Sequence, residues 1–216
     1  MSGEIDPILL IIGLSVLALV PFLAVMTTSF VKLAVVLGLL RNALGVQQIP
    51  PNMALHGLAI ILTFYIMAPV MFEIQDIVEQ EPIELNSLAN LGPVIDKSVI
   101  PFKDFLKKHS NERERKFFKV NAEKLWPKAY SDRIDDNSLL ILVPAFTVSE
   151  LTSAFEIGFL LYLPFVAIDL IVSNILLAMG MMMVSPMTIS LPFKLLLFVL
   201  LDGWARLIHG LVLTYM

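Results

Sequence analysis

Long apolar stretches on both sides of one polar stretch dominate the sequence. About 20 apolar residues cross a bilayer as a helix, so each apolar block predicts a membrane helix. The four blocks cover residues 8–26, 54–72, 157–183 and 191–214. A shorter apolar helix is predicted at 28–41, followed by the adjacent prolines Pro50 and Pro51, which disfavour helix. The pattern therefore predicts a hairpin turn at 45–51.

The polar stretch covers residues 73–138 and holds 13 of the 19 acidic and 11 of the 15 basic residues. Within it, 101–126 mixes charges of both signs with phenylalanines and predicts helix. Two interpretations stay open: a solvated helical hairpin with a small apolar side, or a surface that docks a partner. The chain thus divides into N-terminal apolar helical hairpins (1–72), a polar extracytoplasmic insertion (73–138) and C-terminal apolar helices with a methionine-rich turn (139–216).

The positive charges predict an orientation. Lys32 and Arg41 lie beside the first turn and Lys194 beside the second, whereas the N-terminal tail carries only Glu4 and Asp6. Because basic loops stay in the cytoplasm, both turns are expected there, with four crossings and with 73–138 on the far side. The tail lacks the basic residues of a secretory signal. The first block is therefore expected to be retained.

Residues 144–163 predict an amphipathic helix. Pro164 interrupts the pattern, so a kink or a new helix is expected there. Pro186 and Pro192 are expected to bracket a second turn. The polar arc of the amphipathic helix contains Ser149, Glu150, Thr152, Ser153 and Glu156.

Ionisable residues inside apolar stretches are costly in lipid and usually face the bundle interior, another subunit or water. Asp202 and Arg206 are four residues apart in the favourable acid-first order, which predicts an internal ion pair. The full set is Lys32, Glu150, Glu156, Asp169, Lys194, Asp202 and Arg206.

Asp169 allows two interpretations. It shares a helical stripe with Ser173 and Gly180, which favours a close helix contact with polar bonding. With Glu150 and Glu156 it could instead form a proton relay, although no basic partner or repeated relay spacing accompanies it. The second interpretation would make the chain an ion channel or a proton-coupled transporter.

Methionine is concentrated just before Ser185. Five of the 11 methionines lie within residues 179–187. Flexible, unbranched thioether side chains fill irregular spaces. Near a helix end they could be ordinary lipid-facing or core residues, or a deformable plug that closes an opening.

Composition excludes several other classes of protein. With 57% hydrophobic and 16% charged residues, the chain carries more apolar surface than a soluble domain of its size hides. The net charge of −4 argues against nucleic acid. The histidines have no HExxH spacing, cysteine is absent, and neither a Gly-x-Ser-x-Gly elbow nor a phosphate loop occurs. Asp169 and Asp202 lack the Gly-x-Gly-Asp arrangement of intramembrane aspartyl proteases. No catalytic residue, metal or cofactor is therefore expected, and the chain is predicted not to be an enzyme.

Three stretches are similar to the FliP/SctR family of type III secretion export-gate proteins. The first runs from Ser29-Phe30-Val31-Lys32 through Arg41-Asn42-Ala43-Leu44-Gly45 to Gln48-Ile49-Pro50-Pro51-Asn52. The second is Pro144-Ala145-Phe146 with Ser149-Glu150-Leu151 and Ala154-Phe155-Glu156-Ile157-Gly158-Phe159. The third joins Leu163-Pro164-Phe165, Asp169-Leu170-Ile171, Gly180-Met181-Met182-Met183, Ser185-Pro186 and Leu201-Asp202-Gly203-Trp204.

The resemblance implies an all-α, membrane-associated bundle of bent helical hairpins with a polar, helical insertion. Five copies are expected to assemble with FliQ/SctS-like and FliR/SctT-like subunits, in contact with membrane lipid, into a pore that exports unfolded proteins. The gate is expected in the bacterial inner membrane, projecting toward the periplasm, so the four crossings need not hold in the assembled state. The acidic start favours the virulence (injectisome) SctR branch.

The resemblance also assigns roles to particular residues. Met181, Met182 and Met183 are expected to form a gasket around the lumen. The ionisable residues of the apolar stretches are expected in buried or inter-subunit polar contacts. These are Lys32, Glu150, Glu156, Asp169, Asp202 and Arg206.

Overall fold

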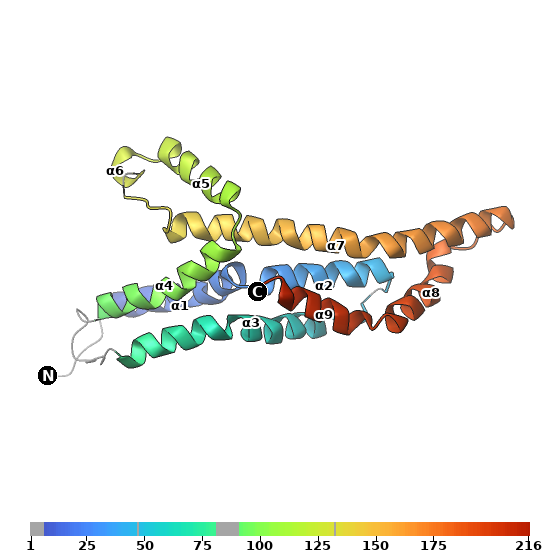
Figure 1. Cartoon of the computed structure of the whole chain (residues 1–216), viewed down its shortest axis with the longest axis horizontal. Helices are drawn as coiled ribbons and strands as arrows, with labels where there is room; N and C mark the ends of the chain where they lie inside the picture. The colour runs from blue at the N-terminus through green and yellow to red at the C-terminus, as the bar shows by residue number, and fades with distance from the viewer. Residues whose placement is uncertain (1–6, 47, 81–90, 132) are drawn as a thin grey trace.

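The computed structural model describes residues 7–46, 48–80, 91–131 and 133–216. Within these ranges every regular element is a helix, so the all-α prediction is confirmed. The molecule is elongated, and α7 (Leu139–Ala178) runs along most of its length (Figure 1). The other helices pack along this one or branch from it.

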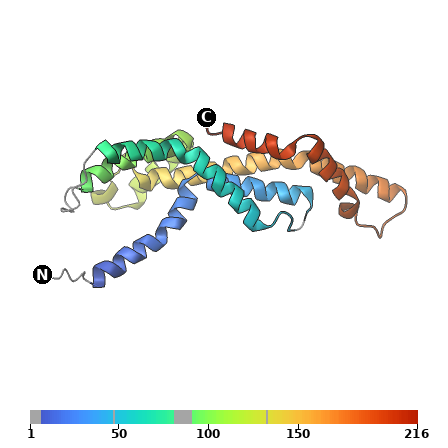
Figure 2. The ribbon, with the colours of Figure 1, turned by 90° about the horizontal axis from the view of Figure 1, so that it is seen from below.

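The N-terminal part contains a bend followed by a hairpin. α1 (Pro7–Thr27) and α2 (Phe30–Leu44) meet at 63°, and α1 leaves the body of the molecule (Figure 2). α2 ends where Gly45 adopts a φ of 75°, a conformation that glycine reaches without strain. α3 (Asn52–Gln80) then returns along α2. The predicted turn at 45–51 is therefore present, with Gln47 outside the described residues.

The polar insertion is joined to the body of the protein. It forms α4 (Leu91–His109), α5 (Glu112–Leu125) and the short α6 (Lys128–Ser131). The helix predicted at 101–126 breaks because Asn111 caps α5, accepting a hydrogen bond from the Arg113 amide, while its own amide donates to Ser149 of α7 at 2.8 Å. α4 packs on α3 and α7, and α5 packs on α7.

α7 is one helix of 40 residues, about 60 Å long. The new helix offered as one outcome at Pro164 is wrong, because both Pro144 and Pro164 lie inside α7. The kink stays a prediction. A proline removes one backbone hydrogen bond, and packing against α2 keeps the helix continuous on either side.

The predicted polar arc of α7 is also wrong at Glu150. This residue is 2% exposed and shares a buried stripe with Phe146, Ala154 and Gly158, each four residues from the next. A Cβ at Gly158 would overlap the Leu39 side chain of α2, so glycine there permits close approach of the two helices. The stripe faces inward although one member is charged.

The C-terminal part forms a second bent pair. α8 (Pro186–Leu200) and α9 (Gly203–Leu213) meet at 62°, at a break where Asp202 has a φ of 50°. The second turn precedes the predicted position, because Pro186 starts α8 and Pro192 lies within it. The connection between α7 and α8 is instead made by residues 179–185.

The core centres on α2, whose Leu33, Val36 and Leu37 are fully buried between α3, α7 and α9. Elsewhere much apolar surface is open, including Phe22 and Phe64, which are 71% and 61% exposed. Among the described residues, α3 and α7 are long and apolar enough to cross a membrane, and the two bent pairs raise the number of candidate spans to four. This surface and these lengths give the protein a membrane location.

Candidate functional site

The end of α7 is built to place methionines at one tip of the molecule. The Gly180 amide donates to the Leu177 carbonyl at 3.0 Å, and the Met181 amide donates to the Leu176 carbonyl at 2.9 Å. These two bonds, with a Gly180 φ of 74°, form the left-handed motif that commonly stops a helix. Ser185 and Pro186 then start α8.

The methionines of this connection are open to their surroundings. Met181, Met182 and Met183 are 44%, 81% and 100% exposed, and they lie between α7 and α8 at one end of the long axis (Figure 1). We call residues 179–187 the methionine turn. The described part of the chain leaves Met182 and Met183 almost fully open and covers Met181 only in part, so flexible apolar groups are available for contact with other molecules.

An ion pair joins the two helices that carry the turn. Lys194 of α8 contacts Asp169 of α7 at 2.6 Å and also donates to the Ala43 carbonyl at the end of α2, at 3.2 Å. The Ser190 hydroxyl donates to the other Asp169 oxygen at 2.5 Å. The Lys194 side chain is 2% exposed and that of Asp169 is 32% exposed. We call this cluster the tip pair.

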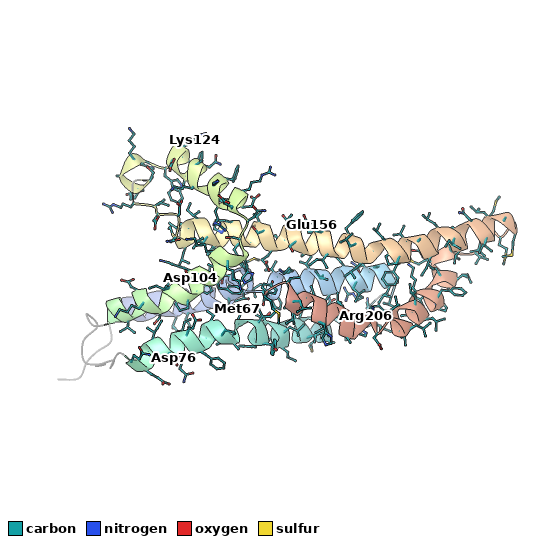
Figure 3. The ribbon with its side chains drawn as sticks, in the orientation of Figure 1. Met67, Asp76, Asp104, Lys124, Glu156 and Arg206 are labelled. Atoms are coloured by element: carbon teal, nitrogen blue, oxygen red, sulfur yellow. The ribbon has the colours of Figure 1, made fainter. Side chains whose placement is uncertain are left out.

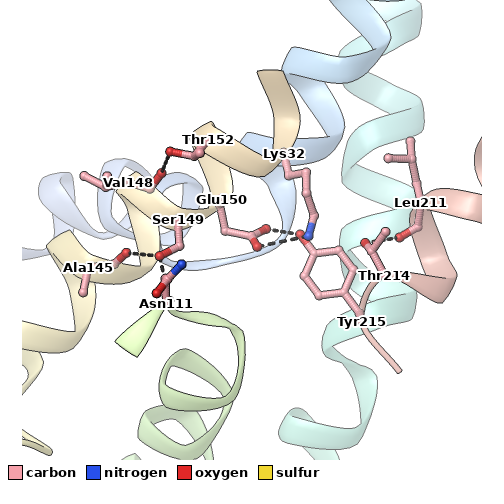
Figure 4. A network of polar contacts seen from close by, with 10 residues as sticks. All are labelled: Lys32, Asn111, Ala145, Val148, Ser149, Glu150, Thr152, Leu211, Thr214 and Tyr215. Atoms are coloured by element: carbon pink, nitrogen blue, oxygen red, sulfur yellow. Dashed lines mark hydrogen bonds and ion pairs between the residues drawn. The ribbon is translucent and has the colours of Figure 1, made fainter. Parts of the chain in front are cut away.

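A second ion pair lies near the middle of the molecule. Lys32 of α2 contacts Glu150 of α7 at 3.0 Å, and the two side chains are only 4% and 3% exposed. The Tyr215 hydroxyl donates to the other Glu150 oxygen, and the Lys32 ammonium lies 3.9 Å from the centre of the Tyr215 ring (Figure 4). We call these three residues the junction, because they tie α2 and α7 to the segment after α9.

The polar insertion reaches the junction through aromatic rings. His109 at the end of α4 lies between Phe105 and Tyr215, with ring centres 4.7 and 5.1 Å away. Burial, followed by the positive charges of Lys108 and Lys32, lowers the pKa of His109 to about 4. His109 therefore stays neutral at neutral pH, where a charged imidazole would face two lysines.

Three predicted site residues have no polar side-chain partner in the described part of the chain: Glu156, Asp202 and Arg206 are exposed, and no ion pair joins Asp202 to Arg206. The pair predicted from their spacing is wrong because Asp202 precedes α9 in a left-handed conformation, outside a continuous helical turn. Their role between subunits stays a prediction.

Sequence reasoning missed three partners. Lys194 was placed beside the second turn and among the ionisable residues of the apolar stretches, but it was not paired with Asp169, although a lysine between Phe193 and Leu195 indicates a buried partner. Ser190 lies four residues before it, on the same face of the helix. Nothing in the sequence around Tyr215 indicates that its hydroxyl bonds to a buried carboxylate. Because Lys32 and Lys194 are buried in ion pairs, the predicted orientation rests on Arg41 alone.

The described residues contain no group of three or more acidic or histidine side chains that could hold a metal ion. The polar groups of the tip pair bond to each other, and so do the polar groups of the junction. Chemically, the arrangement can stiffen helix contacts and present an apolar tip.

Comparison with known proteins identifies the family. The sequence model of the FliP family matches residues 13–211, which is most of the chain. The chain belongs to the FliP family. A "Yop proteins translocation protein R" of Yersinia pestis is 63% identical over 210 residues, covering 97% of each chain. A "Virulence protein YscR" of Salmonella typhimurium is 50% identical over 216 residues, covering both chains entirely.

A plant-associated relative extends the comparison. The "Hypersensitivity response secretion protein HrcR" of Ralstonia nicotianae is 50% identical over 211 residues, covering 95% of this chain and 96% of the relative. These names confirm the resemblance to the virulence branch of the FliP family. Members of the family are components of secretion apparatus and not enzymes, in agreement with the prediction from sequence.

Proposed function

We propose that this chain is a core subunit of a type III secretion export gate. Several copies, five by the family resemblance, surround a pore together with FliQ/SctS-like and FliR/SctT-like subunits, and unfolded proteins pass through it. The assembly sits in the bacterial inner membrane and projects toward the periplasm. The observation that carries the proposal is the methionine turn, a cluster of exposed flexible apolar side chains at one end of a rigid 40-residue helix.

The helices on either side of the methionine turn are held in place, whereas its methionine side chains are flexible. The helix stop at Gly180 ends α7, and the tip pair joins α7 to the middle of α8, so the turn has a defined place. Met181, Met182 and Met183 themselves are unbranched and exposed. When turns from neighbouring copies meet, such side chains close the lumen by apolar contact, part around a passing chain of any sequence, and close again behind it.

The competing function, a proton-coupled transporter or ion channel, needs carboxylates that are free to exchange protons along a path. Asp169 contacts Lys194 and Ser190, and Glu150 contacts Lys32 and Tyr215. Glu156 lies exposed on α7 and bonds to neither of them. These contacts favour a structural role for both ion-paired carboxylates, and therefore favour the gate.

The test replaces Met181, Met182 and Met183 together with alanine in a secreting cell. Small-ion leakage and substrate secretion are recorded at matched protein levels. A matched control replaces three exposed methionines outside the turn, Met26, Met53 and Met71, which are 49%, 85% and 52% exposed.

A gasket predicts increased leakage with secretion retained in the turn variant, and no leakage in the control. Unchanged leakage with normal secretion in the turn variant would contradict the assignment of the methionine turn as the seal. Equal leakage in both variants would trace the effect to a general loss of methionine packing and would also contradict it.

A further inference from the structure

Of the three site-residue charges that are unpaired within the described residues, Glu156 and Arg206 have opposite signs and lie on opposite edges of the apolar body, while Asp202 lies just before the helix that carries Arg206. Glu156 lies on α7 along the upper edge in Figure 3, and Arg206 lies on α9 along the lower edge. Neither side chain has an ion pair or hydrogen bond within the described residues. An isolated charge on a lipid-facing surface is costly, so each needs a partner outside its own chain.

The surfaces around the two charges differ in shape. Glu156 is flanked by Phe155 and Phe159, whose side chains are 59% and 64% exposed. Arg206 instead lines an apolar cavity of about 420 Å³, together with Leu40 of α2 and Phe165 of α7. That volume is in the range of roughly 300–1,000 Å³ that accepts drug-sized molecules, so it has room for aromatic side chains.

We propose that Glu156 of one copy binds Arg206 of the next copy, with the phenylalanines beside Glu156 seated against the cavity beside Arg206. This contact rests on the proposed function, because it requires several copies in one assembly. It joins two different surfaces of the same chain. Such a heterologous contact leaves a free Glu156 edge at one end and a free Arg206 edge at the other, so it generates a ring or a helical array rather than a closed dimer.

The pairing explains why both charges stay in an apolar region. Between copies, the ion pair is shielded from water, where the attraction of two charges is several times stronger than at an open surface. Like charges brought together in the same place repel each other. The pair therefore selects one edge as the partner of the other and prevents two identical edges from meeting.

Cysteine cross-linking tests the contact directly, because the chain contains no cysteine of its own. One tagged copy carries Glu156→Cys and a differently tagged copy carries Arg206→Cys, both within the assembled secretion apparatus. A short bismaleimide serves as linker, since a disulfide needs Cα atoms within about 7 Å and two long paired side chains hold them farther apart. Lys124→Cys, at an exposed site on the polar insertion, replaces Glu156→Cys in the matched control.

The expected product is a dimer that contains both tags, absent from the Lys124→Cys control. A chain that carries Glu156→Cys and Arg206→Cys together should give a ladder beyond the dimer. Products that join only Glu156→Cys to itself, or only Arg206→Cys to itself, would overturn the pairing. So would an apparatus that contains several copies and secretes normally without any cross-link, and that result would leave the proposed function standing.

Charge reversal provides a second measurement. Glu156→Arg or Arg206→Glu alone should reduce the amount of multi-copy complex by about tenfold or more, because each places like charges together. The doubly reversed chain should recover most of that complex. A doubly reversed chain that assembles no better than the single variants would contradict the pairing, whereas unaltered chains that never associate would overturn the proposed function as well.

Discussion

The junction and the tip pair contain the same chemistry in different surroundings. At the junction, the Lys32 and Glu150 side chains are 4% and 3% exposed, and Tyr215 completes the site from the same chain. At the tip, Lys194 is equally buried, but Asp169 is 32% exposed, and the methionine turn beyond it is uncovered. The junction is complete within one chain, whereas the tip presents surface that only other molecules can cover.

The largest expected effect is loss of one junction charge. Glu150→Ala leaves the Lys32 ammonium buried without its carboxylate, which typically costs about 3–5 kcal/mol of folding free energy. Denaturation in detergent, followed by tryptophan fluorescence, measures the loss. Glu156→Ala is the matched control, because it removes an exposed glutamate from the same helix and should change stability little. Equal stability of the two variants would show that the junction does not hold the fold.

The next effect comes from the close contact of α2 with α7. Gly158→Val places a branched side chain against Leu39, where a Cβ already overlaps, and overpacking of this kind costs about 1–3 kcal/mol. Gly57→Val on α3 meets open space at its Cβ and serves as control. The same denaturation measurement compares them. A Gly158→Val chain as stable as the control would mean that the two helices can separate freely.

The tip pair should matter less for the isolated chain than the junction does. Asp169→Asn removes the negative charge beside the buried Lys194 ammonium, and a buried charged group that loses its partner charge costs about 1–3 kcal/mol. Adding Lys194→Met should restore much of that stability, since apolar replacement of a whole pair is often neutral. Denaturation midpoints of the single and double variants provide the check. A double variant less stable than Asp169→Asn would contradict this account of the pair.

The effect expected to be smallest near neutral pH is a dependence of stability on pH at His109, beside the junction. The pKa of His109 is lowered from an ordinary 6.5 to about 4, so the unfolded chain binds the proton more readily between these values. The contribution of neutral His109 to the free energy of unfolding is present above pH 6.5 and is lost as the pH falls toward 4. Comparing the denaturation midpoint of His109→Gln with that of the unaltered chain across this range measures the contribution. Identical slopes would rule out His109 as the source.

The apolar pattern located the helical hairpins because periodicity and proline pairs are local. The Pro50-Pro51 turn and the extra apolar helix before it are both found in the structure. The sequence could not decide between a kink and a new helix at Pro164, because the packing by α2 that keeps α7 continuous leaves no trace in the residues near Pro164. A proline thus marks a stop only where nothing else holds the helix.

The charged contacts were harder to predict. Asp169 and Lys194 are 25 positions apart, and Lys32 and Glu150 are 118 apart, so helical spacing could not pair them. Local spacing instead suggested Asp202 with Arg206, which the left-handed backbone at Asp202 prevents. The cost of a buried charge indicated that partners must exist, but only the fold identified them.

The central claim is that methionine turns of neighbouring copies meet around a lumen. Met183→Cys in this cysteine-free chain tests it most directly, because Met183 is fully exposed in the single chain. In the assembled apparatus, mild oxidation should give disulfide-linked copies, and modification of the thiol with a bulky maleimide should block secretion. Complete modification with normal secretion and no link between copies would contradict the claim.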